Sequence, residues 1–179
     1  MKTPMKLSIV ISATLALTFL FSSFNDGGYH KIAQDAIKKY NPKRKDYVIV
    51  VDYTKNIMTE RLFVIDMKNE KIVISTEVSH AWKSGVLYPS DYSNEPGSNK
   101  SSKGCFITEG TKQGKFGYSM IIRGLDGGIN DNAKSRAVIF HSTEKMSTAW
   151  SNGCFATPDG VNKQIIDLTK NGCLVVVID

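Results

Sequence analysis

The stretch "YVIVVDYTKNIMTERLFVIDMKNEKIVISTEVS", residues 47–79, decides the fold class. It holds three runs rich in Val, Ile and aromatic residues, which favour β-strands. The first run, 47–53, is apolar almost throughout and predicts a buried strand. The next two, 61–67 and 71–79, flank the polar turn "KNE" like the arms of a hairpin. These runs predict a body built mainly of β-strands.

The chain on either side of this stretch adds a few helices. Residues 29–40 place one apolar stripe on a helix that Asn41-Pro42 closes, formed by Ile32, Ala33, Ala36, Ile37 and Tyr40. A second helix is predicted over 157–172, with Thr157 as its cap and Pro158 at its first position. Its buried stripe is expected to consist of Val161, Ile165 and Leu168.

Further strands are predicted over 105–110, 118–125, 136–141 and 173–178. A long segment rich in Ser, Gly, Asn and Pro, 80–104, is predicted to be a loop, and loops of this length in compact domains are usually functional or disordered. The sequence shows no internal repeat and no second domain. The predicted fold is mostly β with a few helices, and the C-terminal helix and strand close it.

The first 24 residues form a separate segment. "MKTPMK" is basic, and the apolar run "LSIVISATLALTFLF", 7–21, follows it before the polar turn "SSFNDGG". This order is typical of a secretory signal. Phe21 and Phe24 interrupt the cleavage-site pattern, so an uncleaved membrane anchor is the alternative. We therefore divide the chain into a signal peptide or anchor (1–24), a helix and linker (25–46) and an exported domain (47–179).

The net charge of +6 favours anionic surroundings. The basic residues form no convincing patch, and no aromatic residues line a basic face, so we expect no nucleic-acid partner. Without the first 24 residues the domain keeps a charge of about +4, because Lys2 and Lys6 are lost. We expect an exported monomer in the periplasm or cell envelope.

The chain has three cysteines, and an odd number in an exported protein leaves at least one thiol unpaired. Cys105 and Cys173 stand at predicted strand starts and are expected to be structural, as apolar filler or as a disulfide with each other. Cys154 differs because it follows the turn "SNG". It lies thirteen residues after His141, which ends the predicted strand 136–141.

Cys154 and His141 have the residue types of a thiol nucleophile and its base. Asn152-Gly153 favours a turn that presents the thiol, and the helix predicted to follow would lower the thiol pKa. Backbone N–H groups of Gly153 and Cys154 are the expected oxyanion donors. The alternative interpretation makes His141 an ordinary strand-end residue and Cys154 a small buried side chain.

Other chemistries have weaker support. One His and one Cys thirteen residues apart form a poor metal site, and we expect no metal and no cofactor. A serine nucleophile would need a GxSxG-type elbow, which the sequence lacks. The acidic residues give no distinctive pair for glycoside hydrolysis.

The order of these elements resembles the murein L,D-transpeptidase catalytic domains, the YkuD-like family, over roughly residues 47–179. His141 matches the strand-end histidine of that family, and Ser151, Gly153 and Cys154 match the end of its Ser-His-Gly-Cys motif. Asn152 stands where the commoner motif has its second histidine, which places the chain in the Ser-x-Gly-Cys branch. The loop of nine residues before Ser151 is shorter than the commonest one, and Ala156 replaces a frequent Asn.

The resemblance implies a YkuD-like β-sandwich or barrel-like fold and a cysteine acyltransferase that acts on peptidoglycan stem peptides. Cys154 would form an acyl-enzyme with release of D-Ala and pass the acyl group to an amine or to water, with His141 as the base. A wall-binding domain without catalysis is the alternative. The substrate-binding candidates are Ser151, Asn152, Arg123, His80 and Tyr118.

Overall fold

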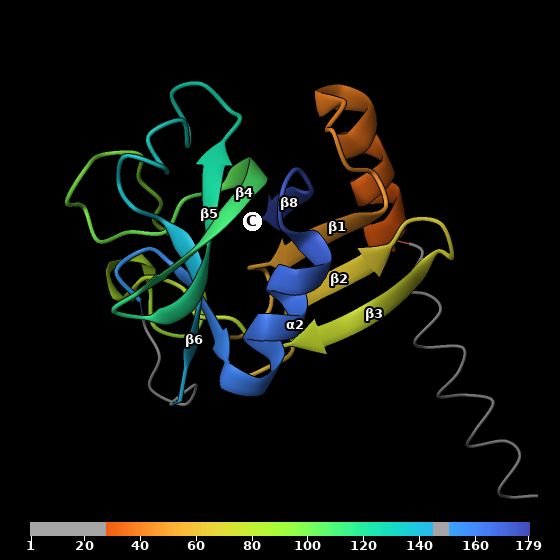
Figure 1. Ribbon diagram of the computed structural model, residues 1–179. Coiled ribbons are helices and arrows are strands. Elements are labelled where there is room, and N and C mark those ends of the chain that lie inside the picture. The colour runs from red at the N-terminus through yellow and green to blue at the C-terminus, as the bar shows by residue number, and fades with distance from the viewer. Residues whose placement is uncertain (1–27, 145–150) are drawn as a thin grey trace, which may run out of the picture.

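The computed structural model describes residues 28–144 and 151–179, and the sheet that dominates it is drawn in Figure 1. Its strands lie in the order β3-β2-β1-β8-β4-β5-β6-β7, in a nearly closed, barrel-like arrangement. The prediction of a mostly β fold with a few helices is confirmed. The strands are β1 Tyr47–Asp52, β2 Leu62–Asp66, β3 Lys71–Thr76, β4 Gly104–Gly114, β5 Gly117–Gly124, β6 Ile139–Thr143, β7 Phe155–Pro158 and β8 Leu174–Ile178.

The three strands predicted from residues 47–79 form one half of the sheet together with β8. β1 pairs antiparallel with β2, β2 pairs antiparallel with β3, and β8 lies parallel to β1. Side chains along β1 alternate between two apolar clusters: Ile49 and Val51 join one, whereas Val48 and Val50 join the other. Because both faces are covered, the run is apolar without a polar alternation.

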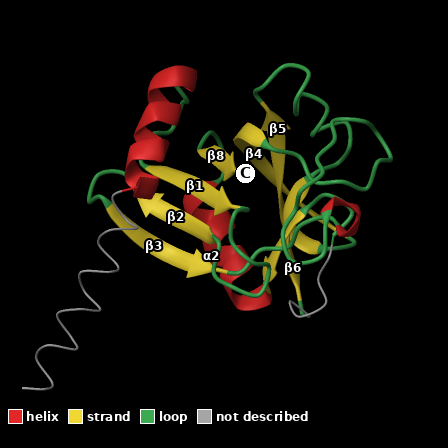
Figure 2. Ribbon diagram, turned by 180° about the vertical axis from the view of Figure 1, so that it is seen from behind, coloured by secondary structure: helices red, strands yellow, loops and turns green. Residues whose placement is uncertain are grey.

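One helix covers each face of this half (Figures 1 and 2). The predicted N-terminal helix spans residues 28–40 and packs Tyr29, Ala33 and Ala36 against the cluster around Val48. The other helix, α2 Asp159–Thr169, packs Ile165 and Ile166 into the opposite cluster. The cluster that α2 packs into also contains side chains of β5, β6 and β7, so α2 joins the two halves of the sheet.

The start of α2 differs from the prediction. Thr157 is not a helix cap, because it belongs to β7, where it pairs with Ser142. Pro158 is the N-cap residue, with ψ 143°, and it makes no side-chain capping bond. A residue before proline avoids the helical region of backbone space, so Thr157 stays extended and the helix begins at Asp159.

The other half of the sheet holds β4 to β7. β4 and β5 form a longer hairpin than predicted, and its turn carries Phe116. β6 begins three residues later than predicted, because residues 127–137 form successive turns that end at Ala137 with φ +56°. The short parallel strand β7 was not predicted. It is only four residues long and begins one residue after the SNG turn, directly after Cys154.

The predicted loop 80–104 contains only one short helical turn, η1 Trp82–Ser84, before β4 begins at Gly104. The predicted signal or anchor, 1–24, lies outside the described residues. Within the described ranges, no helix is both long enough and apolar enough to cross a bilayer.

Candidate active site

The parallel pair β6–β7 places His141 and Cys154 on one face of the sheet. Phe140 pairs with Phe155 and His141 pairs with Ala156. The Phe140 and Phe155 rings stack in the core with centroids 4.9 Å apart. Because successive strand residues point to opposite faces, His141 and Ala156 face away from that core. Cys154, two residues before Ala156, starts the same row.

The Cys154 thiol lies against the main chain that leads into β6. Its Sγ is 3.6 Å from the carbonyl oxygen of Ala137 and is a hydrogen-bond donor to it. Burial raises the pKa of the Cys154 thiol. The Ile139 amide and the charges of Lys112 and Arg136 oppose that rise without reversing it. The resting thiol is therefore protonated at neutral pH.

The expected effect of a helix end on Cys154 is not present. The prediction placed the positive end of a helix next to the thiol, but β7 separates Cys154 from the first helical residue, Asp159. A helix dipole acts mainly within its first turn. The thiol pKa is accordingly raised by burial.

The imidazole of His141 is almost buried, and its tautomer is set by the main chain. Nδ1 lies 2.8 Å from the Ser142 carbonyl oxygen. A carbonyl only accepts, so Nδ1 carries the proton and Nε2 keeps the lone pair. Burial lowers the pKa of His141, with partial opposition from this hydrogen bond. The neutral ring therefore has the form of a general base.

Phe116 is a site residue that sequence reasoning missed. Its ring stacks on His141 with centroids 4.5 Å apart and an interplanar angle of 24°. Phe116 lies at the tip of the β4–β5 hairpin and remains 46% exposed. A large apolar residue between two glycines, Gly114 and Gly117, was the available signal, because a hairpin tip is normally polar.

The turn before the nucleophile is held by Ser151. Its Oγ accepts from the Gly153 N–H at 3.0 Å and donates to the Cys154 carbonyl at 2.7 Å. Gly153 has φ +122°, and a Cβ there would lie 3.0 Å from the Lys100 carbonyl oxygen. Glycine is therefore required for its backbone shape. Its N–H is occupied by Ser151, which does not fit the prediction of Gly153 as a free oxyanion donor.

Residues 78–82 run beside the nucleophile segment. Ser79 is fully buried, and its Oγ accepts from the Ala156 N–H at 2.9 Å and donates to the Cys154 carbonyl at 3.2 Å. Its own N–H donates to the Ala156 carbonyl at 2.8 Å. Ser79 thus fixes the main chain on both sides of Phe155. The sequence offered no signal for this contact between segments 75 residues apart.

His80 was predicted to be a substrate-binding residue, but its side chain does not face an open cleft. Its side chain is fully buried, with Nδ1 2.9 Å from Arg61 Nη2 and Nε2 2.9 Å from the Gly85 carbonyl. Arg61 is also fully buried and donates through Nε and Nη2 to the Val78 carbonyl. His80 reaches the site only through its carbonyl, which accepts from the Ser151 N–H at 2.9 Å.

Asn152 lies on the surface beside Trp82. Its Oδ1 accepts from the Trp82 indole N–H at 3.2 Å, and Trp82 is 53% exposed. The Trp82 backbone N–H donates to the Ser151 carbonyl at 3.1 Å. The residue that replaces the second histidine of the commoner motif is thus oriented by the loop that follows His80.

Arg123 and Tyr118 lie on opposite faces of β5. The register Met120↔Phe140 and Ile121↔Ile139 puts Arg123 on the face of His141. Its Nε donates to Glu109 at 3.2 Å.

The other β5 candidate, Tyr118, packs against the core and its hydroxyl donates to Asp167 of α2 at 2.9 Å. The prediction of Tyr118 as a substrate contact does not fit this placement, because period-two alternation turns it away from His141.

All three cysteines are free thiols. Cys105 pairs with Val176 across β4 and β8, whereas Cys173 lies beside Thr108. Three positions along paired strands separate the two cysteines, which is too far for a disulfide. The structure is therefore consistent with their role as structural residues. It contradicts the alternative of a disulfide.

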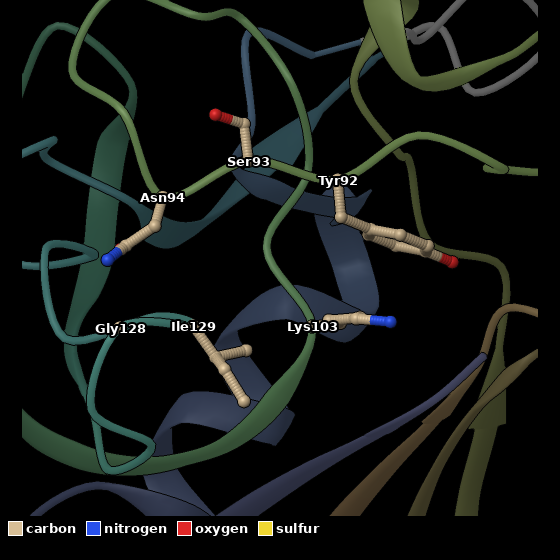
Figure 3. Close-up of a pocket in the computed structure, with 6 residues that line it drawn as sticks. All are labelled: Tyr92, Ser93, Asn94, Lys103, Gly128 and Ile129. Carbon is tan, nitrogen blue, oxygen red and sulfur yellow. The ribbon is translucent and has the colours of Figure 1, made fainter.

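A separate cavity of about 220 Å³ lies between residues 92–94 and 128–129, with Lys103 at one side (Figure 3). Its polar groups already have partners. Asn94 bonds Asp131 and Asn132, and Lys103 pairs with Asp179 at 2.8 Å. None of the residues predicted from the sequence lines it. Among the described residues, no cluster of His, Cys, Asp or Glu is suited to hold a metal ion.

The fold and the site define a barrel-like β domain that carries a histidine on β6 and a cysteine just before β7 on one face of the sheet. The sequence matches the family model of the L,D-transpeptidase catalytic domain, YkuD_2, over residues 26–178. The chain belongs to the L,D-transpeptidase catalytic domain family. The family resemblance predicted from 47–179 is confirmed and extends through the helix 28–40. No curated protein matches the sequence significantly.

Solved L,D-transpeptidase structures are similar to this fold. The helical cell shape determining protein Pgp2 from Campylobacter jejuni, in a mutant form, superposes with a TM-score of 0.54 at 12% identity, covering 84% of this chain and 54% of that one. An L,D-transpeptidase from Xylanimonas cellulosilytica gives 0.46 at 14% identity, covering 74% and 60%. One from Enterococcus faecium gives 0.44 at 17% identity, covering 74% and 50%. The chain thus spans at most 60% of the length of each of these solved chains.

Proposed function

We propose that this protein is a cysteine acyltransferase that acts on peptidoglycan stem peptides, with Cys154 as nucleophile and His141 as general base. The observation that carries the proposal is the shared face of His141, on β6, and Cys154, the residue just before β7. Membership of the L,D-transpeptidase catalytic domain family supports the substrate class. No metal or organic cofactor enters the reaction.

The first half-reaction begins from a neutral pair. His141 Nε2 takes the proton of the Cys154 thiol, and Sγ attacks the carbonyl carbon of the diamino acid at position three of the stem. The C–S bond forms as the C–N bond to the terminal D-Ala breaks, and the proton on Nε2 passes to the departing amine. Because the resting thiol is protonated, this step depends on the base.

The second half-reaction returns the enzyme to its starting state. A side-chain amine of a neighbouring stem attacks the thioester, gives its proton to His141 Nε2 and forms the new peptide bond. The C–S bond breaks, and the proton returns to Sγ. Water in place of the amine gives hydrolysis, so a carboxypeptidase differs from a transpeptidase only in the acceptor.

The main chain around Cys154 supplies the oxyanion site in this proposal. The Gly153 N–H is occupied by Ser151 Oγ, so we assign the donor role to the Cys154 N–H. Asn152 is the exposed motif side chain two residues before Cys154 and is our candidate for a substrate contact, whereas Ser151 shapes the turn. Arg123 remains a candidate for the stem carboxylate because it shares the face of His141.

We further propose that the domain acts outside the cytoplasm. The basic mature domain suits the anionic envelope, and residues 1–24 have the composition of a signal or an N-terminal anchor. An enzyme of peptidoglycan stems needs this location, since its substrate lies in the cell wall.

Mass spectrometry of the intact protein tests the nucleophile. Incubation with a carbapenem or with a stem tetrapeptide should add one acyl group to the peptide that contains Cys154, and Cys154→Ala should acquire none. The Cys105→Ser protein is the matched control, because it also loses one partly buried thiol. A folded wild-type protein that acquires no adduct from either reagent would overturn the enzymatic proposal.

A wall-binding domain without catalysis is the second candidate. Asn152 in place of the second histidine and the short loop before Ser151 favour it. Binding of purified peptidoglycan by both wild type and Cys154→Ala, with no change in stem-peptide composition in either case, would select this candidate.

A further inference from the structure

Arg136 binds the long loop 80–104 from the turn that precedes β6. Its Nη1 donates to the Ser93 carbonyl and to Ser102 Oγ. Its Nη2 donates to Ser98 Oγ at 3.2 Å and to the Lys100 carbonyl at 2.7 Å. All four acceptors belong to one loop, so a single planar guanidinium holds three separate parts of it together.

The same guanidinium lies beside Gly153, the residue that precedes the nucleophile. A Cβ placed on Gly153 would be 3.6 Å from Arg136 Nη2 and 3.0 Å from the Lys100 carbonyl that Nη2 binds. The next residue, Ala137, accepts the hydrogen bond of the Cys154 thiol at 3.6 Å through its carbonyl. Residues 136 and 137 therefore lie next to two consecutive residues of the nucleophile segment, Gly153 and Cys154.

The charge of Arg136 is not neutralised by an ion pair. Among the described residues, its four hydrogen-bond acceptors are all neutral, and Glu95 is the acid that acts on it from a longer distance. Burial lowers the Arg136 pKa, and the negative charge of an ionised Cys154 raises it. Placing an unpaired cation in a half-buried position is costly. A neutral donor such as Gln would pin a loop at lower cost.

We propose that Arg136 is a positioning residue for Cys154 and supplies the fixed positive charge beside its sulfur when the thiol ionises. This inference rests on the proposed function only in taking Cys154 as the nucleophile. Arg136 differs from Lys112, the other cation that acts on the thiol, because the Lys112 side chain is exposed. A half-buried charge keeps its effect at high salt, whereas an exposed one is screened. Two further groups share the thiol's face: the charged Arg123, which pairs with Glu109 at 3.2 Å, and His141, which is neutral because burial lowers its pKa.

The pH dependence of iodoacetamide alkylation at Cys154 tests the inference. The peptide that contains Cys154 is followed by mass spectrometry, so Cys105 and Cys173 do not interfere. Arg136→Gln should move the midpoint of the profile upward by about one unit, while Arg136→Lys should keep it near the wild-type value. Arg136→Gln and Arg136→Lys both lose hydrogen bonds to the loop 80–104, and they differ in the positive charge. A difference between their midpoints therefore reports the effect of that charge.

Arg44→Gln is the matched control. Arg44 is also half-buried and donates to two carbonyls, those of Leu168 and Lys170, but it lies away from Cys154. Its loss should lower thermal stability and leave the alkylation midpoint unchanged. An equal midpoint in Arg136→Gln and wild type, or an equal shift in Arg44→Gln, overturns the inference.

Two further measurements keep the test decisive. If Arg136→Gln does not fold, the Lys112→Gln protein in about 1 M salt replaces it, where exposed charges are screened within about 3 Å. The alkylation midpoint of the Lys112→Gln protein in high salt should equal its midpoint in low salt. A large upward shift of that midpoint in high salt overturns the inference. Alkylation does not require turnover, so a protein that forms no acyl adduct but shows the Arg136→Gln shift fails the proposed function alone.

Discussion

The Oγ of Ser79 donates to the carbonyl of Cys154 at 3.2 Å, although 75 residues separate the two in the chain. The same oxygen accepts from the Ala156 N–H at 2.9 Å. One buried hydroxyl thus sets the peptide planes on both sides of Phe155. The nucleophile is held by a segment that contains none of the motif residues.

We expect Ser79→Ala to slow acylation of Cys154 about tenfold, because the nucleophile loses its fixed orientation. The buried Ala156 N–H loses its acceptor, which should cost about 1–3 kcal/mol of stability. Carbapenem acylation and thermal melting measure the two effects on one sample. Thr108→Val is the control, since Thr108 Oγ1 accepts from two buried amides far from the site. An equal loss of acylation in both variants would show that Ser79 acts only through stability.

We expect His141→Ala to slow acylation by about 10²–10⁴-fold, the range for a lost general base. Cys154→Ala should abolish it, and the double variant should be no worse, because the two residues act as one unit. Melting temperature is measured on the same His141→Ala sample. If the protein loses stability but keeps its acylation rate, His141 is a structural strand residue and the proposed mechanism fails.

The remaining cysteines should be dispensable for chemistry. Cys173 is fully buried and Cys105 partly so, and burial raises the pKa of both thiols. Neither is therefore ionised at neutral pH. Replacing both with Ser should leave the acylation rate per folded molecule close to that of wild type. A large loss in a double variant that melts normally would mean that one of them has a role in the reaction.

Stability should fall as the pH drops below about 6.5, the ordinary pKa of histidine. Burial lowers the pKa of both His80 and His141 in the folded state. The unfolded chain therefore binds more protons in this range, and acid favours unfolding. His80→Gln keeps a partner for Arg61 and for the Gly85 carbonyl, so it should reduce this pH dependence without collapsing the loop. Chemical denaturation between about pH 5 and 7 measures the slopes, and an unchanged slope in His80→Gln would contradict this role.

The three strands of residues 47–79 were predicted correctly, because Val- and Ile-rich runs leave few alternatives to strands, whether both faces are buried, as in β1 and β2, or one is exposed, as in β3. β7 was not predicted, since four residues between a glycine turn and a proline carry too little pattern. Because β7 was missed, two further predictions were wrong: that Thr157 caps the helix, and that the helix dipole lowers the pKa of Cys154. Local pattern was sufficient where a strand was long, and it failed where pairing with β6 decided the conformation.

The candidate site was predictable only in part for a similar reason. Residue type and the family resemblance single out Cys154 and His141 as the candidate pair. Ser79, Arg136 and Phe116 reach the site through contacts between distant segments, which no local pattern encodes. The buried side chain of His80 contradicts the role that its position at the loop start suggested.

Phe116 should control the protonation of His141. Its ring covers one face of the imidazole at 4.5 Å, and burial is the main cause of the lowered His141 pKa. Phe116→Ala exposes the ring to water, so the His141 pKa should rise toward its ordinary value of about 6.5. The neutral base then disappears at a higher pH, and the acid limb of the acylation profile should move upward. Met58→Ala, which removes another exposed apolar side chain, is the control, and Phe116→Leu should give an intermediate shift. An acid limb that stays in place in Phe116→Ala while the rate falls at every pH would instead make Phe116 a substrate contact.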